Sequence, residues 1–157
     1  MIKCEMMQIK IFSESPEETQ KIAAFFIKTI LQKKGKVSKK ALLVSLEGNL
    51  GSGKTEFLKG VAKAVKLKTR VFSPTFVIMK RFNLTHPVFK YLWHLDCYRL
   101  KKTSELKELG FSDIINDNRN LVFVEWGDKI KKALPKNHLK INFQIIGKNK
   151  RKLTISL

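Results

Sequence analysis

Cysteines and long apolar runs are both scarce in this chain. Its 157 residues contain two cysteines, Cys4 and Cys97, whose separation has no metal-site spacing and which fit a reducing compartment. The longest strongly apolar helical segment, residues 22–27, is far too short to span a bilayer, and the N-terminus has no signal-peptide pattern. We therefore expect a cytoplasmic protein that does not cross a membrane.

Acidic residues are also few. The chain has 13 Asp and Glu against 32 Lys and Arg, a formal net charge of +19, and only five of the cations are Arg. A specific nucleic-acid surface usually depends on Arg for bidentate and stacking contacts, whereas the lysines here are spread along the chain. Two explanations stay open: the coding bias of an AT-rich genome, and a contribution of the charge to binding nucleic acid or an acidic partner.

The apolar pattern predicts strands that alternate with helices in one domain covering residues 1–157. Strands are expected at residues 6–12, 41–46, 70–72, 76–82, 88–96, 121–124, 138–146 and 152–157, and helices at 16–34, 55–66, 103–110 and 129–134. This order predicts an α/β fold of the P-loop NTPase type. Its central sheet should be mostly parallel, with antiparallel strands at the margins and helices on both faces.

Residues 48–55 read G-N-L-G-S-G-K-T, a complete G-x-x-x-x-G-K-[ST] phosphate-binding loop. It stands between an apolar strand and an amphipathic helix, the context in which glycines let backbone N–H groups turn toward phosphates at a helix N-terminus. Lys54 is predicted to reach the β- and γ-phosphates, and the Thr55 hydroxyl to ligate Mg²⁺. The residues of this segment predicted to contact the nucleotide are Gly48, Asn49, Leu50, Gly51, Ser52, Gly53, Lys54, Thr55 and Glu56.

Two acids stand at predicted strand ends. Glu125 follows four apolar residues, where P-loop proteins place a carboxylate near Mg²⁺; the alternative is an acid that only caps the strand. Asp96 shares a strand face with His94 and is a candidate for binding metal-bound water or orienting the attacking water, with His94 as a hydrogen-bonding neighbour. The alternative for Asp96 is a surface acid paired with a lysine, and the alternative for His94 is a purely structural histidine. Trp126, next to Glu125, is either a core aromatic or part of a site wall.

Residues 73–76 read S-P-T-F and follow the phosphate-loop helix. A switch segment that senses Mg²⁺ and the γ-phosphate has this place in the chain, and the Thr75 hydroxyl and N–H suit both contacts. A plain turn with a break before proline is the simpler alternative.

Together these motifs closely resemble the TsaE (YjeE) family, the bacterial ATPases needed for threonylcarbamoyladenosine modification of tRNA. The likeness covers nearly the whole chain and is specific in its combination: the phosphate loop, S-P-T-F at 73–76, H-L-D-C-Y-R at 94–99, E-L-G at 108–110 and V-E-W at 124–126, in this order.

The resemblance implies a small ATPase, weak alone, that uses ATP and Mg²⁺. It implies binding to the TsaD–TsaB threonylcarbamoyl-transferase pair, and contact with tRNA through that complex. It also implies that ATP use resets the transferase between rounds of modifying A37. Lys54, Asp96 and Glu125 carry over as catalytic positions, Thr55 and Glu125 as metal ligands, and Arg151 as a basic residue near the nucleotide.

The chain departs from the family at two loop positions. Asn49 stands where an acid is usual, and Glu56 stands where a second Thr is common. Asn49 keeps the loop shape, whereas Glu56 adds negative charge near the triphosphate. Two other classes stay open. One is a small-molecule kinase, although such kinases usually have an Arg-bearing lid and this sequence shows no obvious one. The other is a nucleic-acid-binding module with a vestigial nucleotide site.

Overall fold

The computed structural model describes residues 8–32, 39–67 and 78–157, and its centre is a seven-stranded sheet with the order β1-β7-β6-β2-β5-β4-β3. The inner strands β6, β2, β5 and β4 run parallel, while β1, β7 and β3 are added antiparallel at the margins. The expected mostly parallel sheet with antiparallel margins is confirmed.

The strands are β1 (Ile9–Ser13), β2 (Leu42–Gly48), β3 (Met79–Asn83), β4 (Tyr91–Asp96), β5 (Asn120–Glu125), β6 (Leu139–Ile145) and β7 (Arg151–Ser156). The helices are α1 (Pro16–Gln32), α2 (Lys54–Ala64), α3 (Glu105–Glu108), α4 (Phe111–Asn116) and the 3₁₀ turn η1 (Gly127–Ile130). None of the described helices is long and apolar enough to cross a bilayer. Expected strands at 70–72 and the start of 76–82 lie outside the described residues.

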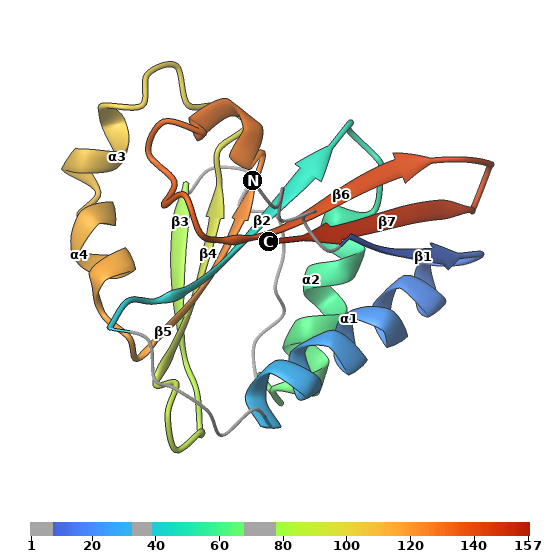
Figure 1. The fold of residues 1–157 in the computed structure, drawn as a ribbon, viewed down its shortest axis with the longest axis horizontal. Coiled ribbons are helices and arrows are strands. Elements are labelled where there is room, and N and C mark those ends of the chain that lie inside the picture. The colour runs from blue at the N-terminus through green and yellow to red at the C-terminus, as the bar shows by residue number, and fades with distance from the viewer. Residues whose placement is uncertain (1–7, 33–38, 68–77) are drawn as a thin grey trace, which may run out of the picture.

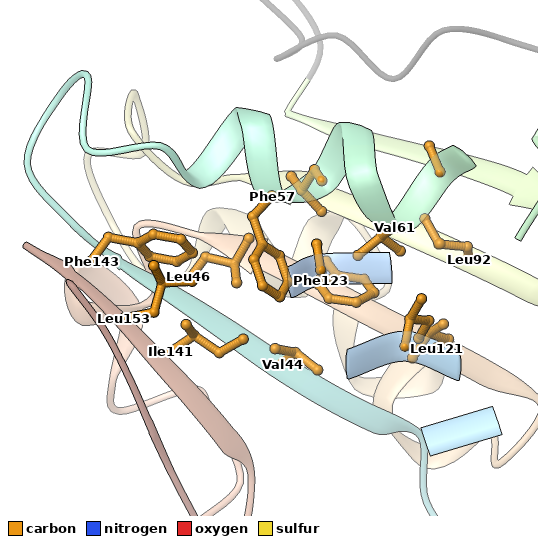
Figure 2. Close-up of a cluster of buried hydrophobic side chains, with 14 of the residues drawn as sticks. Val44, Leu46, Phe57, Val61, Leu92, Leu121, Phe123, Ile141, Phe143 and Leu153 are labelled. Atoms are coloured by element: carbon orange, nitrogen blue, oxygen red, sulfur yellow. The ribbon is translucent and has the colours of Figure 1, made fainter. Parts of the chain in front are cut away.

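Helices cover both faces of the sheet, as expected. In Figure 1, α1 and α2 lie together on one side, and α3 and α4 lie on the other. Figure 2 shows Phe57 and Val61 of α2 pointing toward the sheet, where Leu46 and Phe123 come from neighbouring strands. A second apolar cluster, which includes Val122 and Val124, fills the opposite face. Strand β5 therefore supplies both cores, because its successive side chains point to opposite faces.

The start of α1 is capped by side chains next to its first turn. The Ser15 hydroxyl accepts a hydrogen bond from the Glu18 N–H at 3.1 Å, and the Glu18 carboxylate accepts one from the Glu14 N–H at 2.6 Å. Pro16 is the first helical residue, where its missing N–H costs nothing. Helix α4 was not expected: the chain turns at Gly110 (φ 68°) and starts another helix directly.

Candidate nucleotide-binding site

The phosphate loop joins the C-terminal end of β2 to the N-terminus of α2, and its glycines have backbone angles that favour glycine. Gly48, Gly51 and Gly53 have φ of 139°, 73° and 106°. A Cβ on Gly48 would lie 2.5 Å from the carbonyl oxygen of Phe143 on β6, so a side chain there would force the strands apart. The loop shape therefore depends on these glycines, as the motif predicts.

Lys54 is the first residue of α2, and its side chain folds back into the loop. Only 4% of the residue is exposed, and its ammonium donates hydrogen bonds to the carbonyls of Gly48 at 2.7 Å and Asn49 at 3.0 Å. Burial lowers the pKa of Lys54 below its ordinary value, and the charges of Glu125, Asp128 and Asp96 oppose that shift. An added phosphate would favour the charged ammonium in the same way.

Glu125 is the last residue of β5 and is 2% exposed. The Thr55 hydroxyl faces it across 3.5 Å, measured from Oγ1 to Oε2, which is a long contact. Residue 55 belongs to the first turn of α2, so the helix N-terminus and the end of β5 bring a hydroxyl and a carboxylate together.

This donor pair fits Mg²⁺. In nucleotide sites that ion takes one or two carboxylates and fills its remaining positions with phosphate oxygens and water. No group of three or more His, Cys, Asp or Glu that could form a metal cage occurs within 8–32, 39–67 and 78–157. Thr55 and Glu125 would thus hold the ion together with a nucleotide.

His94 contacts Glu125, whereas the sequence had suggested Asp96 as its neighbour. Its Nε2 lies 3.0 Å from Oε1 of Glu125, and His94 has no exposed surface. Glu125 lies two residues along β5 from Phe123, the residue that pairs with His94, and its long side chain spans this diagonal offset. The expectation failed because nothing within β4 shows that β5 lies beside it.

Asp96 ends β4 and pairs in register with Glu125 on the parallel strand β5. One oxygen, Oδ1, accepts a hydrogen bond from the Tyr98 N–H at 3.0 Å. The structure thus brings both candidate acids to the same edge of the sheet as Lys54, where their predicted roles in hydrolysis stay predictions.

Trp126 forms a wall of this site. Its ring centre lies 3.9 Å from the Lys54 ammonium and 5.0 Å from the ring centre of Tyr98. Its backbone has φ 61°, and a Cβ on the following Gly127 would come within 2.0 Å of the Ser45 hydroxyl. The tight turn after β5 therefore directs the indole toward the loop. Trp126 also packs against the second apolar cluster, so both options for this residue are observed in part.

Arg151, at the start of β7, reaches the loop from the β6–β7 hairpin. Its Nη2 donates to the Gly51 carbonyl at 3.1 Å, and its Nη1 donates to the Gly147 carbonyl at 3.2 Å. The guanidinium thus ties the hairpin turn to the top of the phosphate loop, beside the predicted nucleotide.

Glu56 contacts α1 and a residue of its own helix, α2. Its carboxylate accepts hydrogen bonds from Gln20 of α1 at 2.7 Å and from Lys59 at 2.6 Å. Burial alone would raise the pKa of Glu56, but the bonds from Lys59 and Gln20 outweigh it and lower that pKa. Its negative charge is therefore largely matched within the helix pair.

The remaining predicted positions differ in exposure. Leu50 is 76% exposed, whereas Ser52 is 1% exposed and its hydroxyl has no hydrogen-bond partner among the described residues. Thr75 and its S-P-T-F segment lie outside the described residues. Sequence reasoning missed the contacts His94–Glu125 and Lys54–Trp126. The only sequence signal for these contacts was that Glu125 and Trp126 stand together at the end of a predicted strand.

The comparisons with known proteins all indicate the same family. The family model described as "Threonylcarbamoyl adenosine biosynthesis protein TsaE" matches residues 13–153. The tRNA threonylcarbamoyladenosine biosynthesis protein TsaE of Bacillus subtilis is 35% identical over 151 residues, covering 96% of this chain and 87% of that protein. A protein of the same name from Rickettsia felis is 32% identical, covering 88% of this chain and 74% of its own.

A solved structure agrees. The crystal structure of Bacillus subtilis YdiB superposes with a TM-score of 0.73 at 29% identity, covering 97% of this chain and 86% of that one. The range matched by the family model, residues 13–153, includes the phosphate loop, both strand-end acids and Arg151. This chain therefore belongs to the TsaE family of tRNA threonylcarbamoyladenosine biosynthesis proteins.

Proposed function

We propose that this chain binds ATP with Mg²⁺ and hydrolyses it, as the ATPase partner of the TsaD–TsaB threonylcarbamoyl-transferase. The observation that carries the proposal is the meeting of Thr55 and the buried Glu125 across 3.5 Å beside Lys54. A buried carboxylate facing a hydroxyl at a helix N-terminus suits a metal–nucleotide complex and has no evident packing purpose.

The residues divide the work of phosphate binding. Backbone N–H groups of the loop and the positive end of α2 would receive the phosphates. Lys54 would exchange its bonds to loop carbonyls for bonds to the β- and γ-phosphate oxygens, where it stabilises the charge that develops during transfer. Thr55 and Glu125 would hold Mg²⁺, which would supply further neutralisation of phosphate charge.

Asp96 is assigned to the water. It lies at the same edge of the sheet as Glu125, so a carboxylate oxygen there can orient a water molecule toward the terminal phosphate. Arg151 keeps the top of the loop in place through Gly51. Thr75 is assigned to the metal and γ-phosphate, as its motif predicts.

The mouth of the site motivates dependence on a partner. Leu50 is 76% exposed on the loop and Tyr98 is 48% exposed next to Trp126, so apolar groups border the site in contact with solvent. A site that admits water has a high effective dielectric, which weakens its electrostatic stabilisation of the transition state. TsaD–TsaB binding would cover these groups, and ATP turnover would then reset the transferase between rounds of modifying A37 of tRNA in the cytoplasm.

The test is an omission experiment. ATP hydrolysis and threonylcarbamoyl transfer to tRNA are followed over several rounds with the chain, TsaD–TsaB, ATP or tRNA left out in turn, at low and moderate salt. We expect slow hydrolysis by the isolated chain, faster hydrolysis with TsaD–TsaB, and multi-round transfer only with both. Because the chain has a formal net charge of +19, its association with TsaD–TsaB should weaken as salt rises.

Rapid turnover by the isolated chain, with no effect of TsaD–TsaB on it and none of the chain on multi-round transfer, would show that the proposal is wrong. Transfer of the γ-phosphate to a small molecule in place of water would favour the kinase alternative. RNA binding with steep salt dependence and no turnover would favour the nucleic-acid-binding alternative.

A further inference from the structure

The two oxygens of Glu125 face different partners. Oε1 lies 3.0 Å from Nε2 of His94, and Oε2 lies 3.5 Å from the Thr55 hydroxyl. Both side chains of the His94–Glu125 pair are almost completely buried, at 1% and 3% exposed. One oxygen is thus held inside the sheet face, while the other is turned toward the phosphate loop.

The sheet itself sets this arrangement. Strands β4 and β5 are parallel neighbours, with His94 opposite Phe123 and Asp96 opposite Glu125. His94 and Glu125 therefore lie on one face with a diagonal offset, a distance that a long side chain can bridge. An ionised carboxylate, the form that a metal ligand requires, only accepts hydrogen bonds, and in that form of Glu125 Nε2 of His94 is the donor.

Packing alone does not explain why a histidine occupies position 94. Its other ring nitrogen, Nδ1, is buried and has no hydrogen-bond partner among the described residues. Burying a polar nitrogen without a partner costs free energy, which an apolar side chain of similar size would avoid. Among the described residues, His94 and Thr55 are side-chain hydrogen-bond partners of Glu125, and it is His94 that contacts Oε1.

We propose that His94 is a positioning residue for the metal–nucleotide site: its Nε2–H holds Oε1 of Glu125, so that Oε2 stays turned toward Thr55 and the metal. This inference rests on the proposed function. Groups that orient a metal-binding carboxylate typically change metal affinity by about 10- to 100-fold when they are removed. The free carboxylate would otherwise rotate, and its oxygens would face Thr55 only part of the time.

A matched pair of variants separates positioning from packing. The amide nitrogen of Gln in His94→Gln reaches about as far as Nε2, whereas the shorter Asn in His94→Asn ends near the place of Nδ1. Both substitutions are polar and place an amide in the same buried site. Mn²⁺ binding to the complex with ADP is measured by electron paramagnetic resonance, and ADP affinity is measured by calorimetry with Mg²⁺ and with EDTA.

We expect His94→Gln to bind Mn²⁺ within about threefold of the wild type, and His94→Asn to bind it about tenfold or more weakly. ADP affinity in EDTA should differ by less than about threefold among all three proteins, because loop contacts to phosphate remain. Equal Mn²⁺ affinities for the two variants would overturn the inference. So would a loss of ADP affinity in His94→Asn that is the same with Mg²⁺ and with EDTA, since that pattern indicates a packing role.

Glu125→Gln distinguishes this inference from the proposed function. If the wild type binds Mn²⁺ with ADP and Glu125→Gln does not, the proposed metal site stands whatever the His94 variants show. If the wild type binds ADP without any effect of Mg²⁺ or Mn²⁺, the proposed metal site and the role of His94 both fail.

Discussion

The ammonium of Lys54 lies 3.9 Å from the centre of the Trp126 ring while it donates to two carbonyls of its own loop. Such a cation–π contact contributes about 0.5–2 kcal/mol, depending on how far water is excluded. An ammonium has three donors, so binding phosphate oxygens requires it to give up some of these contacts. The environment of the Trp126 ring should therefore change when nucleotide enters the loop.

Fluorescence tests this coupling. The chain has two tryptophans, so Trp93→Phe leaves Trp126 as the reporter, and Trp126→Phe leaves Trp93 as the matched control. Both rings pack against the second apolar cluster, but Trp93 lies within β4, whereas Trp126 follows the end of β5 and contacts Lys54. We expect Mg–ADP to change the emission of Trp126 clearly and that of Trp93 little. Equal changes in both variants, with binding confirmed by calorimetry, would contradict the assignment.

Lys54→Ala should remove ATP hydrolysis while the fold remains. Loss of the ammonium deletes charge stabilisation of the terminal phosphates, and loss of one such donor typically slows the reaction by about 10²–10³-fold. Phosphate release measures the rate, and circular dichroism measures the fold. Lys59→Ala, on the same helix but paired with Glu56, is the control and should retain activity. A rate within about threefold of wild type, a barrier change under about 0.7 kcal/mol, would refute the role of Lys54.

The parts of this site that depend on local sequence could be predicted from it. The loop glycines, Lys54 and Thr55 occupy fixed places because one short turn between a strand and a helix sets their geometry. The end of β5 at Glu125 was also predictable, since an apolar run that stops at an acid marks where a buried strand reaches the sheet edge.

Contacts between distant elements could not be predicted in the same way. The pairing of His94 with Glu125 depends on β4 and β5 being neighbours, and nothing local to either strand states that order. The contact of Trp126 with Lys54 depends on a positive φ that a non-glycine residue rarely adopts. Glu56 was expected near the triphosphate, but its partner Gln20 comes from α1, 36 residues away in sequence.

Substitutions at the two strand-end acids should have different effects. Glu125→Gln removes the charge that we propose holds the metal, so it should shift the Mg²⁺ dependence of nucleotide binding. Asp96→Asn should slow hydrolysis with little change in nucleotide affinity, because orienting water matters chiefly in the transition state. Calorimetry over a range of Mg²⁺ concentrations and single-turnover hydrolysis separate the two. Identical effects of both changes, or the reverse pattern, would show that the roles are misassigned.

Gly60→Ala tests how the helix pair supports the loop. Gly60 lies within α2, where alanine ordinarily stabilises a helix by about 1 kcal/mol relative to glycine. Here the opposite sign is expected. A Cβ at this position would lie 2.3 Å from the backbone oxygen of Gln20 and 2.8 Å from the Cβ of Ala23, so α1 and α2 must move apart.

The nearest clash is with backbone, which cannot rotate away as a side chain can, and overpacking of this kind costs about 1–3 kcal/mol. We therefore expect urea unfolding to give a lower free energy of unfolding for Gly60→Ala, whereas Lys28→Ala on the exposed side of α1 should change it by less than about 0.5 kcal/mol. Because α2 begins with Lys54 and Thr55, its displacement should also weaken ADP binding, which calorimetry measures on the folded variant. A Gly60→Ala protein as stable as the wild type would mean that the close approach of α1 and α2 at Gln20 does not exist in solution.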